Sequence, residues 1–428
     1  MQIFSYNFQL ILIGLKKYNI FFVFSILTII GAGILLFILS NGDITGISAD
    51  FDLYYRPILE LKESDCKLLE CAKFFNSFNP SNEYIRNWVV SPIYTLFFLT
   101  PISLFNSELL FLIQGLILTI VNITLIKEIL KIFYKRIFSR FSINLVVFIG
   151  TFHSGFLKDS LTNGTMSICL LFILLSIFFF NKNKFLASIF LIIASAIRPN
   201  FIFAWFTFLI SLLIFRPKKF KSIIWFLIPS FIAYIFSYYY FYASNPGSFT
   251  SNIFLTGLRN FDQIYDYILP SLPISNVDEL FRWAPSFQEV FFYLINDYRL
   301  IYMTIIIYII KVFHFLGFLG PDLIWDHRGL FLQRLPGLFY SLLFMIPSFV
   351  FSNLVIIYNY FIKLEYFTKW ELITIAWSIL YIYLHSFYLG DTRYLIGFNF
   401  IYIITLLKFI KWIYKSNVDL KRNKIIDL

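Results

Sequence analysis

Apolar runs long enough to cross a lipid bilayer recur along nearly the whole chain, with only short polar segments between them. A helix needs about 20 apolar residues to cross the hydrocarbon core of a bilayer. Hydrophobic residues make up 59% of the 428 residues and aromatic residues 22%, a composition that excludes a soluble fold. The sequence therefore predicts an all-α protein: one integral membrane domain over residues 1–428, built as a bundle of about ten or eleven transmembrane helices.

The distribution of charge predicts which side of the membrane each end of a run faces. The net charge is +11, and most lysines and arginines lie in short loops and in the tail 413–428. Cytoplasmic loops of membrane proteins carry such an excess. We therefore expect both termini in the cytoplasm and the protein in the inner membrane of a bacterium. The same rule explains the basic charge without nucleic acid, which is not an expected partner.

The longest polar segment in the first half of the chain, 41–90, follows the first apolar run, 21–39. Between positions 41 and 87 it carries eight acidic side chains against five basic ones, so we expect it to form a first outer loop on the non-cytoplasmic side. Its two cysteines, Cys66 and Cys71, can pair in an oxidising compartment. Their spacing of five suits a bridge poorly within a regular helix, and the sequence leaves the pairing open.

The segment 91–105 is apolar but short for a crossing, and it contains Pro92 and Pro101. Proline interrupts a helix. A basic cluster between 127 and 140 follows the next run, 108–126. Since an odd number of crossings must connect the outer loop to that cluster, we expect 91–105 to be interfacial or re-entrant and 108–126 to cross.

Two longer apolar regions, 143–180 and 185–215, have basic residues at both ends. A straight helix over 185–215 would be about 46 Å long, well over the ~30 Å hydrocarbon core. Both regions are therefore predicted to be helical hairpins that turn back on the outer side. The turns are 153–160 and Arg198-Pro199-Asn200.

The later part of the chain is less clear. A second acidic outer loop is expected over 243–298, and a basic tail ends the chain in the cytoplasm. Counting crossings between these two places leaves one apolar segment between 245 and 335 that must be re-entrant or interfacial. The sequence does not indicate which one.

Four short motifs occur in the polar segments that charge places outside. Asp50-Phe51-Asp52-Leu53-Tyr54-Tyr55 follows the first run, and Ser91-Pro92-Ile93-Tyr94 closes the first outer loop. Lys158-Asp159-Ser160 and Arg198-Pro199-Asn200 lie at the hairpin turns, and Arg393-Tyr394 opens the last run. In this order and with this sidedness the pattern resembles the GT-C superfamily of membrane glycosyltransferases, which use polyprenyl-phosphate sugars. The chain lacks the soluble C-terminal domain of oligosaccharyltransferases, which argues against that branch.

The resemblance implies inverting sugar transfer on the non-cytoplasmic face, with Asp50 as the general base. Asp52 is an orienting partner or a second candidate for the base, since both acids point the same way in an extended loop. A solvated loop acid or a helix cap is the alternative for either one. Tyr54 and Tyr55 can stack on sugar rings, although an interfacial aromatic belt explains them equally well.

Cationic residues near the outer face are candidates for binding the donor phosphate. Arg198 lies at a hairpin turn, and a guanidinium suits the bidentate geometry of phosphate; the alternative is an arginine that snorkels to the interface. Lys158 has the same two interpretations, with Asp159 as a neutralising partner, and Arg393 is a weaker candidate. His153 can position substrate or bind metal, or it is structural at a helix end.

No His and Cys cluster indicates a metal site, and no metal is assigned. A divalent cation held by Asp50 and Asp52 is possible, but many related enzymes need none. The expected partners are the lipid bilayer, a lipid-linked sugar donor, and a glycan, lipid or protein acceptor. Two alternative functions remain: a polysaccharide polymerase or ligase of the O-antigen type, and a transporter or lipid flippase, which would have charged residues midway along its spans and an internal repeat.

Overall fold

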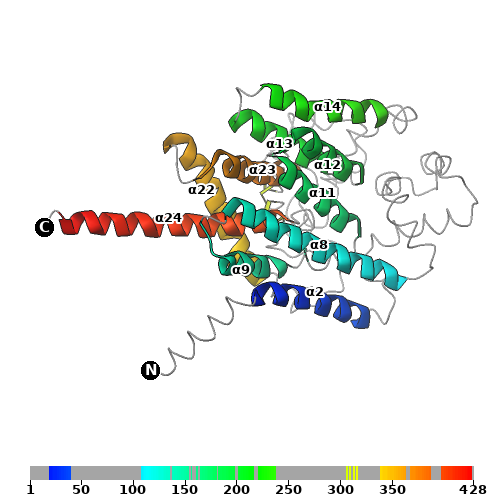
Figure 1. Ribbon diagram of the computed structural model, residues 1–428, viewed down its shortest axis with the longest axis horizontal. Coiled ribbons are helices and arrows are strands. Elements are labelled where there is room, and N and C mark those ends of the chain that lie inside the picture. Colours follow the sequence, from blue (N-terminus) through cyan, green and yellow to red (C-terminus); the bar gives the residue numbers. More distant parts are fainter. Residues whose placement is uncertain are drawn as a thin grey trace, which may run out of the picture.

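A computed structural model describes the chain in several stretches, and every regular element within them is helical (Figure 1). The described residues are 19–39, 108–134, 137–153, 156, 161, 164–180, 182–197, 201–215, 220–237, 305–306, 308–309, 312–313, 315–316, 338–362, 367–386 and 397–426. The predicted all-α class is confirmed for these residues.

The helices begin with α2 (Ile20–Leu39), α8 (Glu108–Tyr134), α9 (Arg140–Thr151) and α11 (Gly164–Phe180). They continue with α12 (Lys184–Ile197), α13 (Ile202–Phe215) and α14 (Phe220–Ser237). The last group is α22 (Ile346–Ile362), which the π-helical turn η5 (Ser341–Met345) precedes, then α23 (Lys369–Ser386) and α24 (Phe398–Ile426). The two regions expected to be hairpins each contain two helices, and the basic tail continues α24 to Ile426.

Polar residues in the short linkers start several of the helices. The Ser139 side chain accepts the backbone N–H of Ser142 at 3.2 Å and caps α9. The Asn183 side chain accepts the N–H of Leu186 at 3.2 Å at the start of α12. These side chains satisfy N–H groups that a first helical turn leaves unpaired, so the breaks between apolar runs become defined helix starts.

Aromatic contacts join helices that are distant in the sequence. Phe180 of α11 stacks on Trp370 of α23 with ring centroids 4.2 Å apart. Phe208 of α13 meets Trp377 of α23 edge to face at 4.7 Å. The Trp377 indole N–H also donates to the Ala204 carbonyl at 2.7 Å. Together these contacts pack α23 against α11 and α13.

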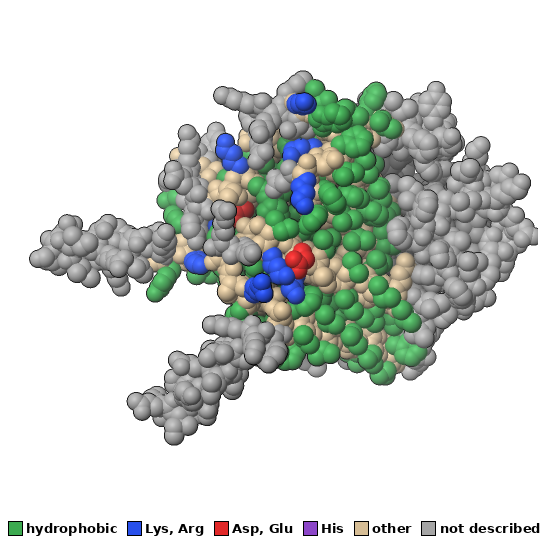
Figure 2. All heavy atoms as spheres, viewed as in Figure 1, with side chains coloured by type: hydrophobic (Ala, Val, Ile, Leu, Met, Phe, Trp, Pro, Cys, Tyr) green, Lys and Arg blue, Asp and Glu red, His purple; other side chains and the backbone are tan. Residues whose placement is uncertain are grey.

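One end of the bundle gathers the positive charge, and we call it the basic end. Lys408 of α24 lies over the rings of Tyr134 and Phe367, and Lys411 donates to the Ile137 carbonyl. The end of α8 and the starts of α9 and α23 therefore meet here. The lysines and arginines that lie at the helix termini of this end or in the second half of α24 are Lys127, Lys131, Arg140, Lys182, Lys184, Lys221, Lys369, Lys408 and Lys411. Figure 2 shows the basic side chains toward the left of the bundle, beside a largely hydrophobic surface.

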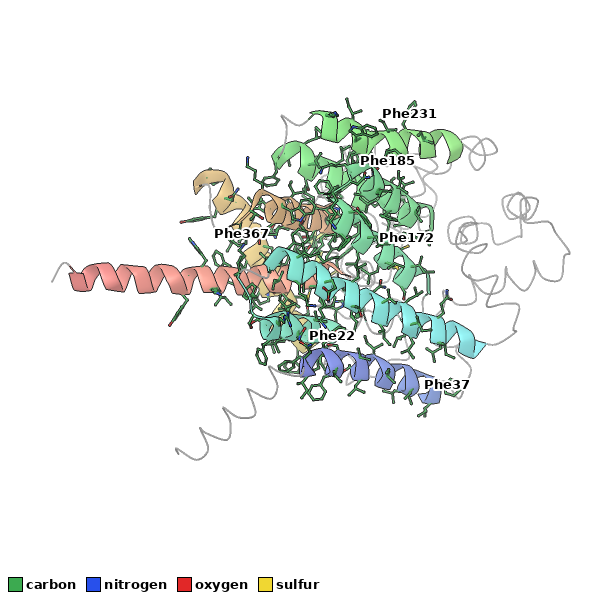
Figure 3. The ribbon with its side chains drawn as sticks, in the orientation of Figure 1. Phe22, Phe37, Phe172, Phe185, Phe231 and Phe367 are labelled. Carbon is green, nitrogen blue, oxygen red and sulfur yellow. The ribbon has the colours of Figure 1, made fainter. Side chains whose placement is uncertain are left out.

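The helices run alternately away from the basic end and back toward it. Phe22 and Phe37 mark the two ends of α2 in Figure 3, and Lys127 lies 3.6 Å from the ring centroid of Phe22. At the other end, which we call the distal end, Asn399 at the start of α24 donates to the Gly150 carbonyl near the end of α9, at 2.9 Å. Both the start of the first described helix and the far end of the last one therefore lie on the basic side (Figure 1).

The described helices are apolar on their outer surfaces as well as in the core. Large side chains such as Phe231, Leu343 and Phe361 are 67%, 65% and 76% exposed. Within the described stretches one helix, Leu338–Asn359, is long and apolar enough to cross a membrane. Six shorter apolar helical segments accompany it: Ile20–Leu35, Arg140–Thr151, Met166–Phe180, Lys184–Ser195, Ile202–Phe215 and Ile223–Ile232. The expected number of ten or eleven spans stays a prediction.

Candidate functional site

Most of the predicted site residues lie outside the described residues, and His153 is the one that lies within them. Those outside are Asp50, Asp52, Tyr54, Tyr55, Lys158, Asp159, Arg198 and Arg393. The segments 41–90, 91–105 and 243–298, with Cys66 and Cys71, also lie outside. The described helices that precede these residues do share a feature. The helices α2, α9, α12 and α23 all end at the distal end, so the chain leaves them there (Figure 1).

His153 follows α9 and is 2% exposed. Its Nδ1 accepts the backbone N–H of Phe156 at 3.3 Å, so the neutral ring carries its hydrogen on Nε2. Burial lowers the pKa of His153 to about 4, because an enclosed imidazolium loses its hydration. Near neutral pH the ring is therefore uncharged, with its lone pair engaged. It is suited to donate a hydrogen bond from Nε2 and poorly suited to act as a general base.

Two side chains from other helices lie close to His153. The Tyr340 ring is edge-on to the imidazole with centroids 5.6 Å apart, and Asn399 is positioned by its bond to the Gly150 carbonyl. Asn399 lies beside the Tyr340 hydroxyl without the geometry of a hydrogen bond. We name His153, Tyr340 and Asn399 the distal polar cluster. All three are at most 9% exposed.

Sequence reasoning missed Tyr340 and Asn399. The signal for Asn399 was weak but present, since it is a polar side chain at the start of a long apolar run. Tyr340 gave no signal, because tyrosines at the ends of apolar runs are common in membrane interfaces. Neither residue could be joined to His153 from sequence, since the contact depends on which helices meet.

The close approach of α9 and α24 depends on the absence of a side chain at Gly150. A Cβ there would meet the ring of Phe400. Phe400 also packs edge to face on Phe156, with centroids 5.5 Å apart. Glycine at 150 thus lets α24 lie against α9, which brings Asn399 within reach of the carbonyl.

The backbone beside Tyr340 is irregular. The π-helical turn η5 begins at the next residue, and Ser341 donates to the Leu316 carbonyl at 2.7 Å. A π turn inserts extra backbone into a helix and often occurs at functional sites. This irregular turn changes the direction in which α22 presents the residues on its two sides.

A second polar group lies at the basic end. Lys408 contacts Glu371 at 2.6 Å with side chains 0% and 3% exposed. The other carboxylate oxygen accepts the Thr368 N–H at 2.6 Å and the Thr368 hydroxyl at 2.9 Å. Because both oxygens are occupied, the carboxylate is suited to hold α23 and α24 together rather than to exchange protons. A cavity of about 30 Å³ beside it is lined by Tyr134, Trp370 and apolar residues of α8, α11 and α24.

The sequence carried a signal for this pair that was not recognised. Thr368 and Glu371 have the spacing of a capping box, and Lys408 interrupts the last apolar run. Among the residues that the structure describes, no group of three His, Cys, Asp or Glu side chains is arranged to hold a metal ion.

The comparisons with known proteins matched no family model, no curated protein and no solved structure.

Proposed function

We propose that the protein is a membrane glycosyltransferase that moves a sugar from a polyprenyl-phosphate donor to a lipid, glycan or protein acceptor on the non-cytoplasmic face. One observation carries the proposal. The described helices that precede the candidate segments all end at the distal end, whereas the lysines and arginines with described side chains lie at the basic end.

Charge sidedness supports this placement. Basic residues stay on the cytoplasmic side of membrane proteins, so the basic end is cytoplasmic in our proposal and the distal end faces outward. The apolar outer surface of the helices fits a lipid environment, because exposed apolar side chains there meet no water. The location that we propose is the inner membrane of a bacterium, with the chain crossing it about ten or eleven times.

The proposed reaction is an inverting displacement. The acceptor hydroxyl attacks the anomeric carbon of the donor sugar as the bond from that carbon to the phosphate oxygen breaks. The Asp50 carboxylate takes the hydroxyl proton, with Asp52 as its partner or as the second candidate. Arg198, Lys158 and Arg393 are candidates to stabilise the leaving lipid phosphate, and Asp159, Tyr54 and Tyr55 to position substrate.

The decisive experiment compares purified wild-type protein with Asp50→Asn in proteoliposomes. Each is supplied with a panel of polyprenyl-phosphate sugars and acceptors, and released lipid phosphate is measured. We expect Asp50→Asn to abolish transfer, because the change removes the base with little change in size. The same assay with EDTA tests the need for a divalent cation.

Asp65→Asn is the matched control, since Asp65 is an acid of the same loop outside the motif. It should retain activity. Full activity in Asp50→Asn would remove Asp50 as the base and point to Asp52. If the wild type released no lipid phosphate from any donor, the polymerase, ligase and transporter alternatives would stand instead.

A further inference from the structure

The distal polar cluster contains hydrogen-bonding groups that no described residue satisfies. The Tyr340 hydroxyl and Asn399 Oδ1 are both enclosed and have no hydrogen-bond partner among the described residues. Leaving a buried polar atom unpaired is destabilising, so such an atom in a native fold needs an explanation, and a ligand is one. The two groups come from different helices and lie at the same point.

The chemistry of the cluster is neutral. His153 offers an N–H at Nε2, Tyr340 offers a hydroxyl that donates or accepts, and Asn399 Oδ1 accepts. None of the three is charged at neutral pH, and the described lysines and arginines lie at the other end of the bundle. A phosphate bound here would find no cation from the described residues. Neutral donors and acceptors in close proximity instead suit a ligand that carries several hydroxyl groups.

Aromatic rings border the same groups. The Tyr340 ring meets His153, and Phe400, next to Asn399 in the chain, packs on Phe156. Binding sites for small molecules combine apolar and aromatic walls with a few placed polar groups. A sugar ring matches this combination, because its carbon-bound hydrogens meet the aromatic rings while its hydroxyls take the hydrogen bonds.

The π turn after Tyr340 is a second, independent feature of the backbone. Such turns are rare inside helices and concentrate at functional sites. Here the turn begins directly after the residue whose hydroxyl is unsatisfied.

We propose that the distal polar cluster binds the sugar of the lipid-linked donor, with Tyr340 and Asn399 as specificity-determining residues that hydrogen-bond its hydroxyls. The inference rests on the proposed function. It divides recognition into two parts: the cluster holds the sugar, and the cationic candidates in the outer segments hold the phosphate.

The test measures binding rather than turnover, in detergent-solubilised full-length protein. The probes are undecaprenyl phosphate alone and undecaprenyl phosphate carrying glucose, mannose, galactose, N-acetylglucosamine or arabinose. Tyr340→Phe should weaken binding of the preferred sugar-bearing lipid by about 3- to 10-fold, the usual effect of one hydrogen bond. Binding of undecaprenyl phosphate alone should not change. The unfolding temperature without ligand should be unchanged or higher, because the variant deletes a hydroxyl that has no partner.

Ser348→Ala is the matched control. Ser348 is also fully buried with an unpartnered hydroxyl, but it lies eight residues further along the same helical segment. It should leave the binding of every probe unchanged. Tyr340→Phe that weakens both kinds of lipid equally, or neither, would overturn the sugar site, as would a lower unfolding temperature with unchanged binding. A wild type that prefers none of the sugar-bearing lipids over undecaprenyl phosphate would overturn the proposed function as well.

Discussion

At the scale of single residues, the absence of one side chain decides whether two helices can meet. Gly150 lies where α9 faces α24, and its carbonyl accepts the Asn399 amide at 2.9 Å. The ring of Phe400 occupies the space that any larger residue at 150 would need. The distal polar cluster therefore depends on a residue that contributes no side chain to it.

This dependence predicts the effect of adding a methyl group. Gly150→Ala should lower the free energy of unfolding by about 1–3 kcal/mol, because the new Cβ overpacks a closed contact. The measurement is thermal unfolding in detergent. Gly31→Ala is the control, since a Cβ at Gly31 meets nothing within 4 Å. In a helix interior it should be neutral or stabilising by up to about 1 kcal/mol. Equal destabilisation by both variants would contradict the packing argument.

Residues could be nominated from the sequence singly but not in sets. His153 was chosen because it is a polar residue in the turn of an apolar region, and the structure places it in a buried polar cluster. Asn399 and Tyr340 were not chosen, because their role comes from a contact between residues 249 positions apart in the chain, Gly150 and Asn399. Local pattern carries no information about such a pairing.

At the scale of elements, α23 and α24 are joined at the basic end by the buried pair of Glu371 and Lys408. Charges taken out of water are stable only when each has its partner. The pair therefore fixes how far α24 can slide along α23. That position in turn sets where Asn399 lies at the distal end, nine residues before Lys408.

Breaking the pair should be more harmful than removing it. Glu371→Gln or Lys408→Met alone should lower the free energy of unfolding by about 3–5 kcal/mol, since each leaves an unpaired buried charge. The double variant should recover much of that loss. Unfolding of the four proteins in detergent gives the coupling energy as a double-mutant cycle. Strictly additive losses would show that the two charges do not depend on each other.

Helices could be anticipated from the sequence better than their lengths or irregularities. Apolar runs and the charges between them indicated where the chain turns, and α9 with α11 and α12 with α13 occupy the two regions expected to be hairpins. The π turn before α22 could not be anticipated, because no glycine or proline marks it. The tail was expected as a separate segment, but it continues α24 to Ile426 because its residues favour helix and contain no breaker.

At the scale of the whole molecule, the alternating direction of the helices separates the chain into two ends of different composition. The described basic side chains gather at one end, and the distal polar cluster lies at the other (Figure 2). On our proposal these ends face opposite sides of a membrane.

This sidedness can be measured directly with single cysteines, after Cys66, Cys71 and Cys169 have been replaced. A membrane-impermeant maleimide applied to cells with a permeabilised outer membrane should label Phe152→Cys at the distal end. It should not label Lys182→Cys at the basic end. Both positions are exposed, so both should react once the membrane is dissolved. Labelling of Lys182→Cys alone in intact cells would invert the proposed orientation, and labelling of both would contradict a membrane crossing between them.

The buried pair of Glu371 and Lys408 also bears on how such a chain is made. The two residues lie on consecutive helices, so the ribosome delivers the acid before the lysine. A lysine that enters lipid alone costs about 2.5–3.5 kcal/mol on insertion scales. On the proposed membrane placement, α23 must therefore wait at the translocon until α24 arrives, and the last two helices leave it together as one hairpin with the ion pair already formed.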